Sequence, residues 1–232
     1  MNPKFLRGIL PVNKASGCSS FRLVELLRNR TGVKTIGHAG TLDPFATGVM
    51  VLLIDRAYTR LSDQFLNSDK QYRATVELGK TTDTFDRDGK VETTSDLVPT
   101  LEQLQSALTA FQGECMQVPP MFSAKKIAGK RCYDLARKGI SVERASVRVQ
   151  ISTQLISYAY PYIELEVTCS KGTYIRSLAH DLGQSLGCGA MLDALIRTRV
   201  GPFLLSECVD QAHLSDPAFD LTPFLRTSLC CV

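Results

Sequence analysis

Apolar residues recur along this chain with two different spacings, and these spacings predict its helices and strands. After the pair Ser19-Ser20, which can cap a helix, leucines return at helical spacing, so a helix is expected to about Arg30. The uninterrupted apolar run over residues 49–54 predicts a buried strand or the start of a buried helix. Periodicity alone does not separate these two alternatives.

Strict alternation of apolar and polar side chains predicts strands over residues 71–78 and 163–169. Two further helices are expected. One starts at a capping box between Thr100 and Gln103, and the other is capped by Thr173. Because strands and helices interleave and hairpin signals lie between them, the fold class is expected to be mixed α/β, of the α+β type.

Three aspartates crowd one expected hairpin turn, which ends in Asp88-Gly89. Asp83, Asp86 and Asp88 suggest a calcium loop, but Thr84 occupies the first ligand position of an EF-hand at this spacing. The segment is therefore expected to be a solvated turn.

Length and composition argue against a disordered, a membrane-spanning or a secreted protein. The chain has 232 residues, of which 44% are hydrophobic and 22% charged, so it is too apolar for a disordered chain. No apolar run approaches the roughly 20 residues of a membrane span, and the N-terminus does not resemble a secretory signal. Without a low-complexity linker, residues 1–232 are expected to form a single domain, with a short C-terminal extension from about residue 204.

The net charge of +4 is too small to identify a nucleic-acid binder, but the basic residues are unevenly distributed. Residues 1–40 hold seven Lys and Arg side chains against Glu25 alone, and residues 120–140 hold six against Asp134. These two segments could fold into one positive face, or each could form a separate solvated surface.

The eight cysteines include no C-x-x-C pair, and the chain has three histidines, so neither a metal site nor a metal cofactor is expected. Without a signal peptide, the cysteines are expected to be reduced thiols in a cytoplasmic protein. The adjacent Cys230 and Cys231 have no evident role.

A glycine-rich segment, GHAGTLDPFATGV over residues 37–49, is the strongest candidate for an active-site loop. Its glycines allow the backbone to approach a ligand, and Pro44 biases Asp43 toward an extended conformation that presents the carboxylate. The residues alone also allow a simple turn at Asp-Pro.

Five segments in order resemble the TruB-type tRNA pseudouridine-55 synthases. The loop GHAGTLDPFATGV is similar to the signature of that family. So are KQYRA at residues 70–74, PPMFSAKK at 119–126, GTYIRSL at 172–178 and LIRT at 195–198. A first motif, NKASGCSS at residues 13–20, departs from the family pattern D-K-P-x-G-x-[ST]-S, because Asn13 and Ala15 replace aspartate and proline.

The resemblance implies a pseudouridine synthase catalytic fold, with a mixed, largely antiparallel sheet flanked by helices. Many bacterial members continue into an RNA-binding PUA-type domain, and this chain is expected to have no full PUA domain. The implied activity is isomerisation of the T-loop uridine of tRNA at position 55, which requires no cofactor. In this reaction Asp43 is the catalytic carboxylate, as a nucleophile at C1′ or as a base at C2′, and Arg176 is its charge partner.

The remaining expected site residues follow from the same resemblance. Tyr72 would stack on the flipped base, Tyr174 and Leu195 would complete the pocket wall, and His38 would fill the space that the base leaves. Phosphate contacts are expected from five basic residues: Lys14, Lys125, Lys126, Lys130 and Arg131.

The expected partner is the T-stem-loop of tRNA, bound by a monomer away from membranes. A tRNA-binding folding factor without activity is the main alternative, although such a protein would have no need of Asp43. A guide-RNA-dependent synthase has a similar catalytic core but depends on an extended C-terminal domain. A metal-dependent nuclease would need more carboxylates than this loop contains.

Overall fold

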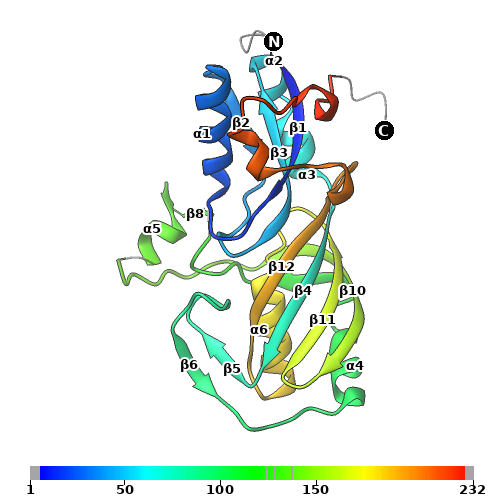
Figure 1. The fold of residues 1–232 in the computed structure, drawn as a ribbon. Coiled ribbons are helices and arrows are strands. Elements are labelled where there is room, and N and C mark those ends of the chain that lie inside the picture. The colour runs from blue at the N-terminus through cyan, green and yellow to red at the C-terminus, as the bar shows by residue number, and fades with distance from the viewer. Residues whose placement is uncertain (1–5, 124, 128, 137, 228–232) are drawn as a thin grey trace. The chain divides into compact units, whose positions relative to one another are not determined.

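The computed structural model of the protein describes residues 6–123, 125–127, 129–136 and 138–227, and it has a mixed α/β fold (Figure 1). Its strands form a large, mostly antiparallel sheet, as expected for the α+β type. The described residues divide into two compact units. Unit 1 comprises residues up to 72 and from 195 onward, and unit 2 comprises residues 73–194. The expectation of a single domain over the whole chain stays a prediction.

Unit 1 contains the chain's first strands and helices together with its C-terminal segment. Its strands follow the order β14-β1-β3-β12, with β2 also paired to β3 and β13 to β12. The pairs β1–β14 and β3–β12 are parallel, whereas β1–β3 and β2–β3 are antiparallel. The elements are β1 (Gly8–Lys14), α1 (Ser20–Thr31), β2 (Ile36–Ala39), β3 (Thr47–Ile54), α2 (Arg56–Thr59), α3 (Ser62–Asn67), β13 (Phe203–Leu204), η2 (Leu205–Glu207), β14 (Val209–Asp210), η3 (Gln211–Leu214) and η4 (Thr222–Phe224).

Two strands, β4 (Lys70–Leu78) and β12 (Ala190–Val200), contribute residues to both units. In unit 2 the strand order is β12-β4-β11-β10-β7. The other elements of unit 2 are β5 (Lys80–Thr82), β6 (Val91–Thr94), α4 (Leu101–Thr109), β7 (Gly113–Gln117), β8 (Lys126–Ile127), β9 (Lys130–Arg131), α5 (Cys132–Ala136), β10 (Val147–Ala159), β11 (Tyr162–Cys169) and α6 (Ile175–Leu186).

Most of the expected elements are confirmed. Ser19 caps α1, its hydroxyl accepting from the Arg22 amide, and the helix ends at Gly32 in the left-handed region. The run over residues 49–54 lies in a strand, β3, which decides the alternative left open by periodicity. The capping box between Thr100 and Gln103 is also present.

Two local expectations are wrong. The cap of α6 is Tyr174 and not Thr173, whose hydroxyl donates instead to the Ser170 carbonyl at 3.0 Å. The turn between β5 and β6 is not solvated throughout, because Asp86 is only 5% exposed. Local sequence shows that a carboxylate lies in a turn, whereas its burial depends on a partner far along the chain.

No helix in the described part of the chain is both long enough and apolar enough to span a membrane.

Candidate active site

The segment that carries Asp43 connects β2 to β3 in unit 1, and its backbone turns sharply. The Ala46 amide donates to the Asp43 carbonyl at 3.2 Å, and the Asp43 side chain is half-buried. Gly48 has a φ of +104°, and a Cβ there would lie 2.2 Å from the carbonyl oxygen of Arg197. A glycine is therefore required where the loop enters β3 beside β12.

The first motif, residues 13–20, braces this loop on both sides of Asp43. Ser20 holds Leu42, the residue before Asp43, because the Ser20 hydroxyl donates to the Leu42 carbonyl at 3.0 Å and accepts from the Leu42 amide at 2.8 Å. The Gly17 amide donates to the carbonyl of Pro44, the following residue, at 2.9 Å. The Asp43 backbone is thus fixed through its immediate neighbours.

Lys14 occupies a position that contradicts its expected contact with phosphate. Its side chain is fully buried, and Nζ donates to the carbonyls of Ala15 and Cys18 at 2.9 Å and of Pro44 at 3.1 Å. Burial lowers the pKa of this ammonium, while the neighbouring Cys18 and Asp43 act in the opposite direction. Lys14 therefore braces the Asp43 loop from inside the protein and cannot reach a phosphate.

A second buried cation, Arg197, supports the loop from β12, and sequence reasoning assigned it no role. Its side chain is 1% exposed and donates to the Val49 carbonyl at 2.7 Å, the Thr41 carbonyl at 3.3 Å and the Gly40 carbonyl at 3.4 Å. These carbonyls bracket Asp43 along the chain. Arg197 is the arginine of the LIRT motif, but the match to that motif did not reveal that this side chain supports the loop.

His38, Tyr72 and Leu195 also belong to unit 1. His38 is half-buried on β2, and burial followed by the charge of Arg197 lowers its pKa, so the ring is neutral at neutral pH. Tyr72 on β4 and Leu195 on β12 are buried, with 8% and 6% exposed.

Arg176 and Tyr174 lie at the start of α6 in unit 2. Tyr174 is held through its backbone, because Gln117 Oε1 accepts from its amide at 2.8 Å and Gln117 Nε2 donates to its carbonyl at 3.0 Å. Arg176 Nη2 donates to the Phe122 carbonyl at 2.7 Å. The PPMFSAKK motif and the residues just before it thereby position the start of α6.

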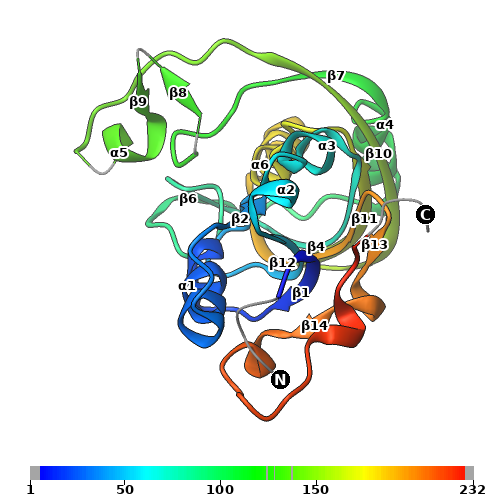
Figure 2. The ribbon, with the colours of Figure 1, turned by 90° about the horizontal axis from the view of Figure 1, so that it is seen from above.

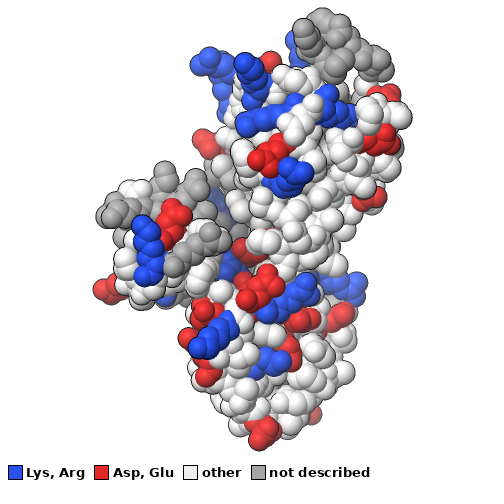
Figure 3. All heavy atoms as spheres, turned by 60° about the vertical axis from the view of Figure 1, so that its left-hand side comes forward, with Lys and Arg blue, Asp and Glu red and all other residues white. Residues whose placement is uncertain are grey.

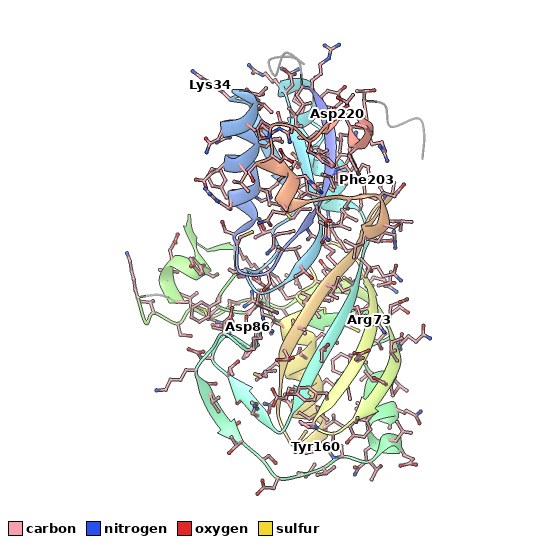
Figure 4. All side chains as sticks on the ribbon, in the orientation of Figure 1. Lys34, Arg73, Asp86, Tyr160, Phe203 and Asp220 are labelled. Carbon is pink, nitrogen blue, oxygen red and sulfur yellow. The ribbon has the colours of Figure 1, made fainter. Side chains whose placement is uncertain are left out.

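Arg176 also forms a buried ion pair that the sequence did not predict. Its Nη1 lies 3.4 Å from Asp86 Oδ2, and both side chains are nearly inaccessible, at 6% and 7% exposed. Asp86 in turn accepts from the Thr84 hydroxyl at 2.7 Å and from the Asp88 amide at 3.1 Å. Figure 4 labels Asp86 at the turn between β5 and β6. The expected pairing of Arg176 with Asp43 joins residues of different units and stays a prediction.

The other expected phosphate contacts are only partly described. Lys125 Nζ donates to the Ala145 carbonyl at 3.4 Å, whereas the side chains of Lys126, Lys130 and Arg131 lie outside the described residues. In unit 1, Lys and Arg side chains gather on the face formed by α1 (Figure 3). Arg22 of α1 and Lys34, which follows this helix in the chain, are both exposed.

Within the described ranges, no group of three or more His, Cys, Asp or Glu side chains could hold a metal ion. None of the six described cysteines forms a disulfide, and Cys230 and Cys231 lie outside the described residues.

Two sequence models of one family match consecutive parts of the chain. Residues 28–175 match the N-terminal domain of the TruB family pseudouridylate synthases, and residues 176–223 match the tRNA pseudouridylate synthase B C-terminal domain.

Curated relatives support the same assignment. The chain is 59% identical to tRNA pseudouridine synthase B of Protochlamydia amoebophila (strain UWE25), over 91% of this chain and 81% of that protein. It is 54% identical to tRNA pseudouridine synthase B of Chlamydia muridarum, over 95% of this chain and 92% of that protein.

Among solved structures, the chain is similar to a crystal structure of a Cbf5–Nop10–Gar1 complex, with a TM-score of 0.71 and 26% identity. That match covers 93% of this chain but only 55% of the other. An archaeal box H/ACA Nop10–Cbf5 complex shares the fold, with a TM-score of 0.66 at 23% identity, and covers 93% of this chain and 57% of the other.

Proposed function

Since the chain belongs to the TruB family and is an isomerase that converts uridine to pseudouridine in tRNA, we propose that it acts on the T-loop uridine at position 55, with Asp43 as the catalytic carboxylate. The observation that carries this proposal is the bracing of the Asp43 loop. Lys14, Ser20 and Arg197 hold the backbone on both sides of one half-buried carboxylate. Such bracing is what a preorganised catalytic group needs.

The proposed reaction requires one carboxylate to act at the ribose. The N1–C1′ bond of uridine breaks, the base turns, and C5 bonds to C1′, while the proton on C5 is lost and N1 gains one. No atom is added and no electron is transferred. Asp43 can serve in two ways: by attacking C1′ as a nucleophile, or by removing the C2′ proton and returning it later.

Arg176 is proposed to hold Asp43 ionised and correctly oriented by a charge-assisted hydrogen bond. Its own position supports this role, because Asp86, Thr84 and Phe122 fix the guanidinium from three directions. A side chain locked in this way can act as a rigid donor without losing the rotamer entropy of a free arginine when the substrate binds.

The target base must leave the stack before it can react. Tyr72 is proposed to stack on it, with Tyr174 and Leu195 completing an apolar wall. His38 is suited to the space that the base leaves, because its lowered pKa keeps the ring neutral. Lys125, Lys126, Lys130 and Arg131 remain the proposed phosphate contacts.

The test compares the wild-type protein with Asp43→Asn on a tRNA transcript in EDTA, with mapping of every pseudouridine formed. The wild type is expected to modify position 55 alone, and Asp43→Asn is expected to bind the transcript but form no product. A transcript with cytidine at position 55 should remain unmodified.

Asp55→Asn is the matched control. Asp55 is an exposed carboxylate of the same unit whose Oδ1 caps α2, and asparagine keeps that acceptor. Normal turnover by Asp43→Asn, or product at a different uridine, would contradict the proposal.

A further inference from the structure

Asn13 and Ala15, the two residues of the first motif that differ from the family pattern, each have a partner in the C-terminal segment, residues 205–227. Asn13 Nδ2 donates to Asp210 Oδ1 at 2.9 Å, and the Ala15 amide donates to Gln211 Oε1 at 3.0 Å. An aspartate at position 13 would instead place two carboxylates face to face. Figure 2 shows this segment, in orange and red, passing beside β1, and β14 pairs with β1 in parallel.

The C-terminal segment is anchored on both sides of Gln211, so the Gln211 side chain projects from a fixed backbone. β14 pairs Val209 with Val12 immediately before it. After it, Arg30 of α1 donates to the His213 carbonyl at 2.7 Å and also to the Phe219 carbonyl. The rings of His213 and Phe219 stack with centroids 3.8 Å apart.

The residues that Gln211 holds are those that brace the catalytic loop. Besides the Ala15 amide, Gln211 Oε1 accepts from the Cys18 thiol at 3.1 Å. Ala15 and Cys18 are the first and last residues of a turn, and the carbonyls of both accept from Lys14 Nζ. The same ammonium also donates to the Pro44 carbonyl. A continuous path of hydrogen bonds therefore runs from Gln211 to the residue that follows Asp43.

Resting on the role proposed above for Asp43, we propose that Gln211 is a positioning residue for this carboxylate, which it holds through the turn at residues 15–18. A proline at position 15 would fix its own φ and would have no N–H to satisfy. Alanine leaves φ free and an amide in need of an acceptor. Gln211 supplies that acceptor and thereby the rigidity that the alanine lacks.

The experiment is a double-mutant cycle on kcat and KM, using the wild type, Gln211→Ala, Ala15→Pro and the double variant. Gln211→Ala is expected to lower kcat about five-fold, chiefly by removing the acceptor of the Ala15 amide, with KM unchanged. Lys14 is extended in β1, which suits a residue before proline. In the Ala15→Pro background, Gln211→Ala should therefore change kcat by less than about two-fold.

Two further variants separate positioning from general destabilisation. Gln211→Glu keeps an acceptor for the Ala15 amide and should restore most of kcat. Gln64→Ala removes an exposed glutamine of α3 in the same unit and should leave kcat and KM unchanged. Thermal unfolding of each variant shows whether loss of stability accounts for any change.

A kcat for Gln211→Ala equal to that of the wild type would overturn the inference. So would a Gln211→Ala substitution that lowers kcat by the same factor in the Ala15→Pro background as in the wild type. If Ala15→Pro does not fold, the comparison of Gln211→Glu with Gln211→Ala decides, and equal kcat values for the two would overturn it. These outcomes leave the proposed function standing as long as Asp43→Asn is inactive.

Discussion

Single residues in unit 1 show how charge is accommodated in the interior. Lys14 and Arg197 are both fully buried, and their hydrogen bonds run mainly to backbone carbonyls. N–H groups removed from solvent are thereby matched with oxygens, which offsets much of the cost of burying the charge. Arg197 directs its backbone hydrogen bonds to the segment that carries Asp43, and Lys14 directs one of its three there, to the Pro44 carbonyl.

His38 makes a pH-dependent contribution at the same scale. Its pKa in the folded protein lies below the ordinary value of 6.5 because of burial and the nearby Arg197. As pH falls below 6.5, the unfolded chain takes up a proton that the folded protein does not, so the free energy of unfolding should decrease.

His38→Gln is therefore expected to lose less stability than the wild type between about pH 7.5 and about pH 5.0, as measured by urea unfolding at both pH values. Part of the decrease should remain in the variant, because burial also lowers the pKa of His180. An equally steep decrease in both proteins would show that His38 is protonated as readily in the folded state.

At the scale of a single element, the start of α1 serves two structural functions. Ser19 caps the helix, and the next residue, Ser20, holds the loop before Asp43. The two hydroxyls are adjacent in the chain but serve different structures. Their substitution separates helix stability from loop geometry.

Ser19→Ala is expected to cost about 1 kcal/mol of stability, as for other N-caps, and to leave kcat nearly unchanged. Ser20→Ala is expected to cost about 1–3 kcal/mol, because the Leu42 amide is left buried without an acceptor, and to lower kcat as well. Urea unfolding and steady-state kinetics on both variants test this. A similar kcat for the two would contradict the assigned role of Ser20.

At the scale of the whole molecule, binding of tRNA should depend on the uneven distribution of charge and not on the net +4. Each phosphate that the protein neutralises releases counterions, so the logarithm of the binding constant should fall linearly with the logarithm of salt concentration. The two basic segments identified in the sequence are the expected source of that slope.

Replacing Lys126, Lys130 and Arg131 together by alanine is expected to reduce the slope by about 0.7–0.9 for each phosphate that the variant no longer neutralises. Salt titrations of tRNA binding measure it. Arg148→Ala removes an exposed charge of β10 paired with Glu114 and should leave the slope unchanged. An unchanged slope in the triple variant would place the phosphate-binding residues elsewhere.

Sequence alone predicted several of the helices and strands, and it singled out the candidate loop around Asp43. Helix caps at Ser19 and Thr100, the alternating strand from Gln71 and the glycine-rich segment around Asp43 all depend on residues close together in the chain. Periodicity and capping are local properties, which is why they can be read without knowing the fold.

Only the tertiary structure decided which polar groups are buried and what they bind. Lys14 was expected to contact phosphate and Asp86 to lie in a solvated turn, yet each is buried against a partner distant in the chain. The bond from Ala15 to Gln211 spans 196 positions, and no local pattern encodes such a pairing. Burial of a charge is favourable only when folding delivers its partner, so its position follows from the fold and not from its neighbours.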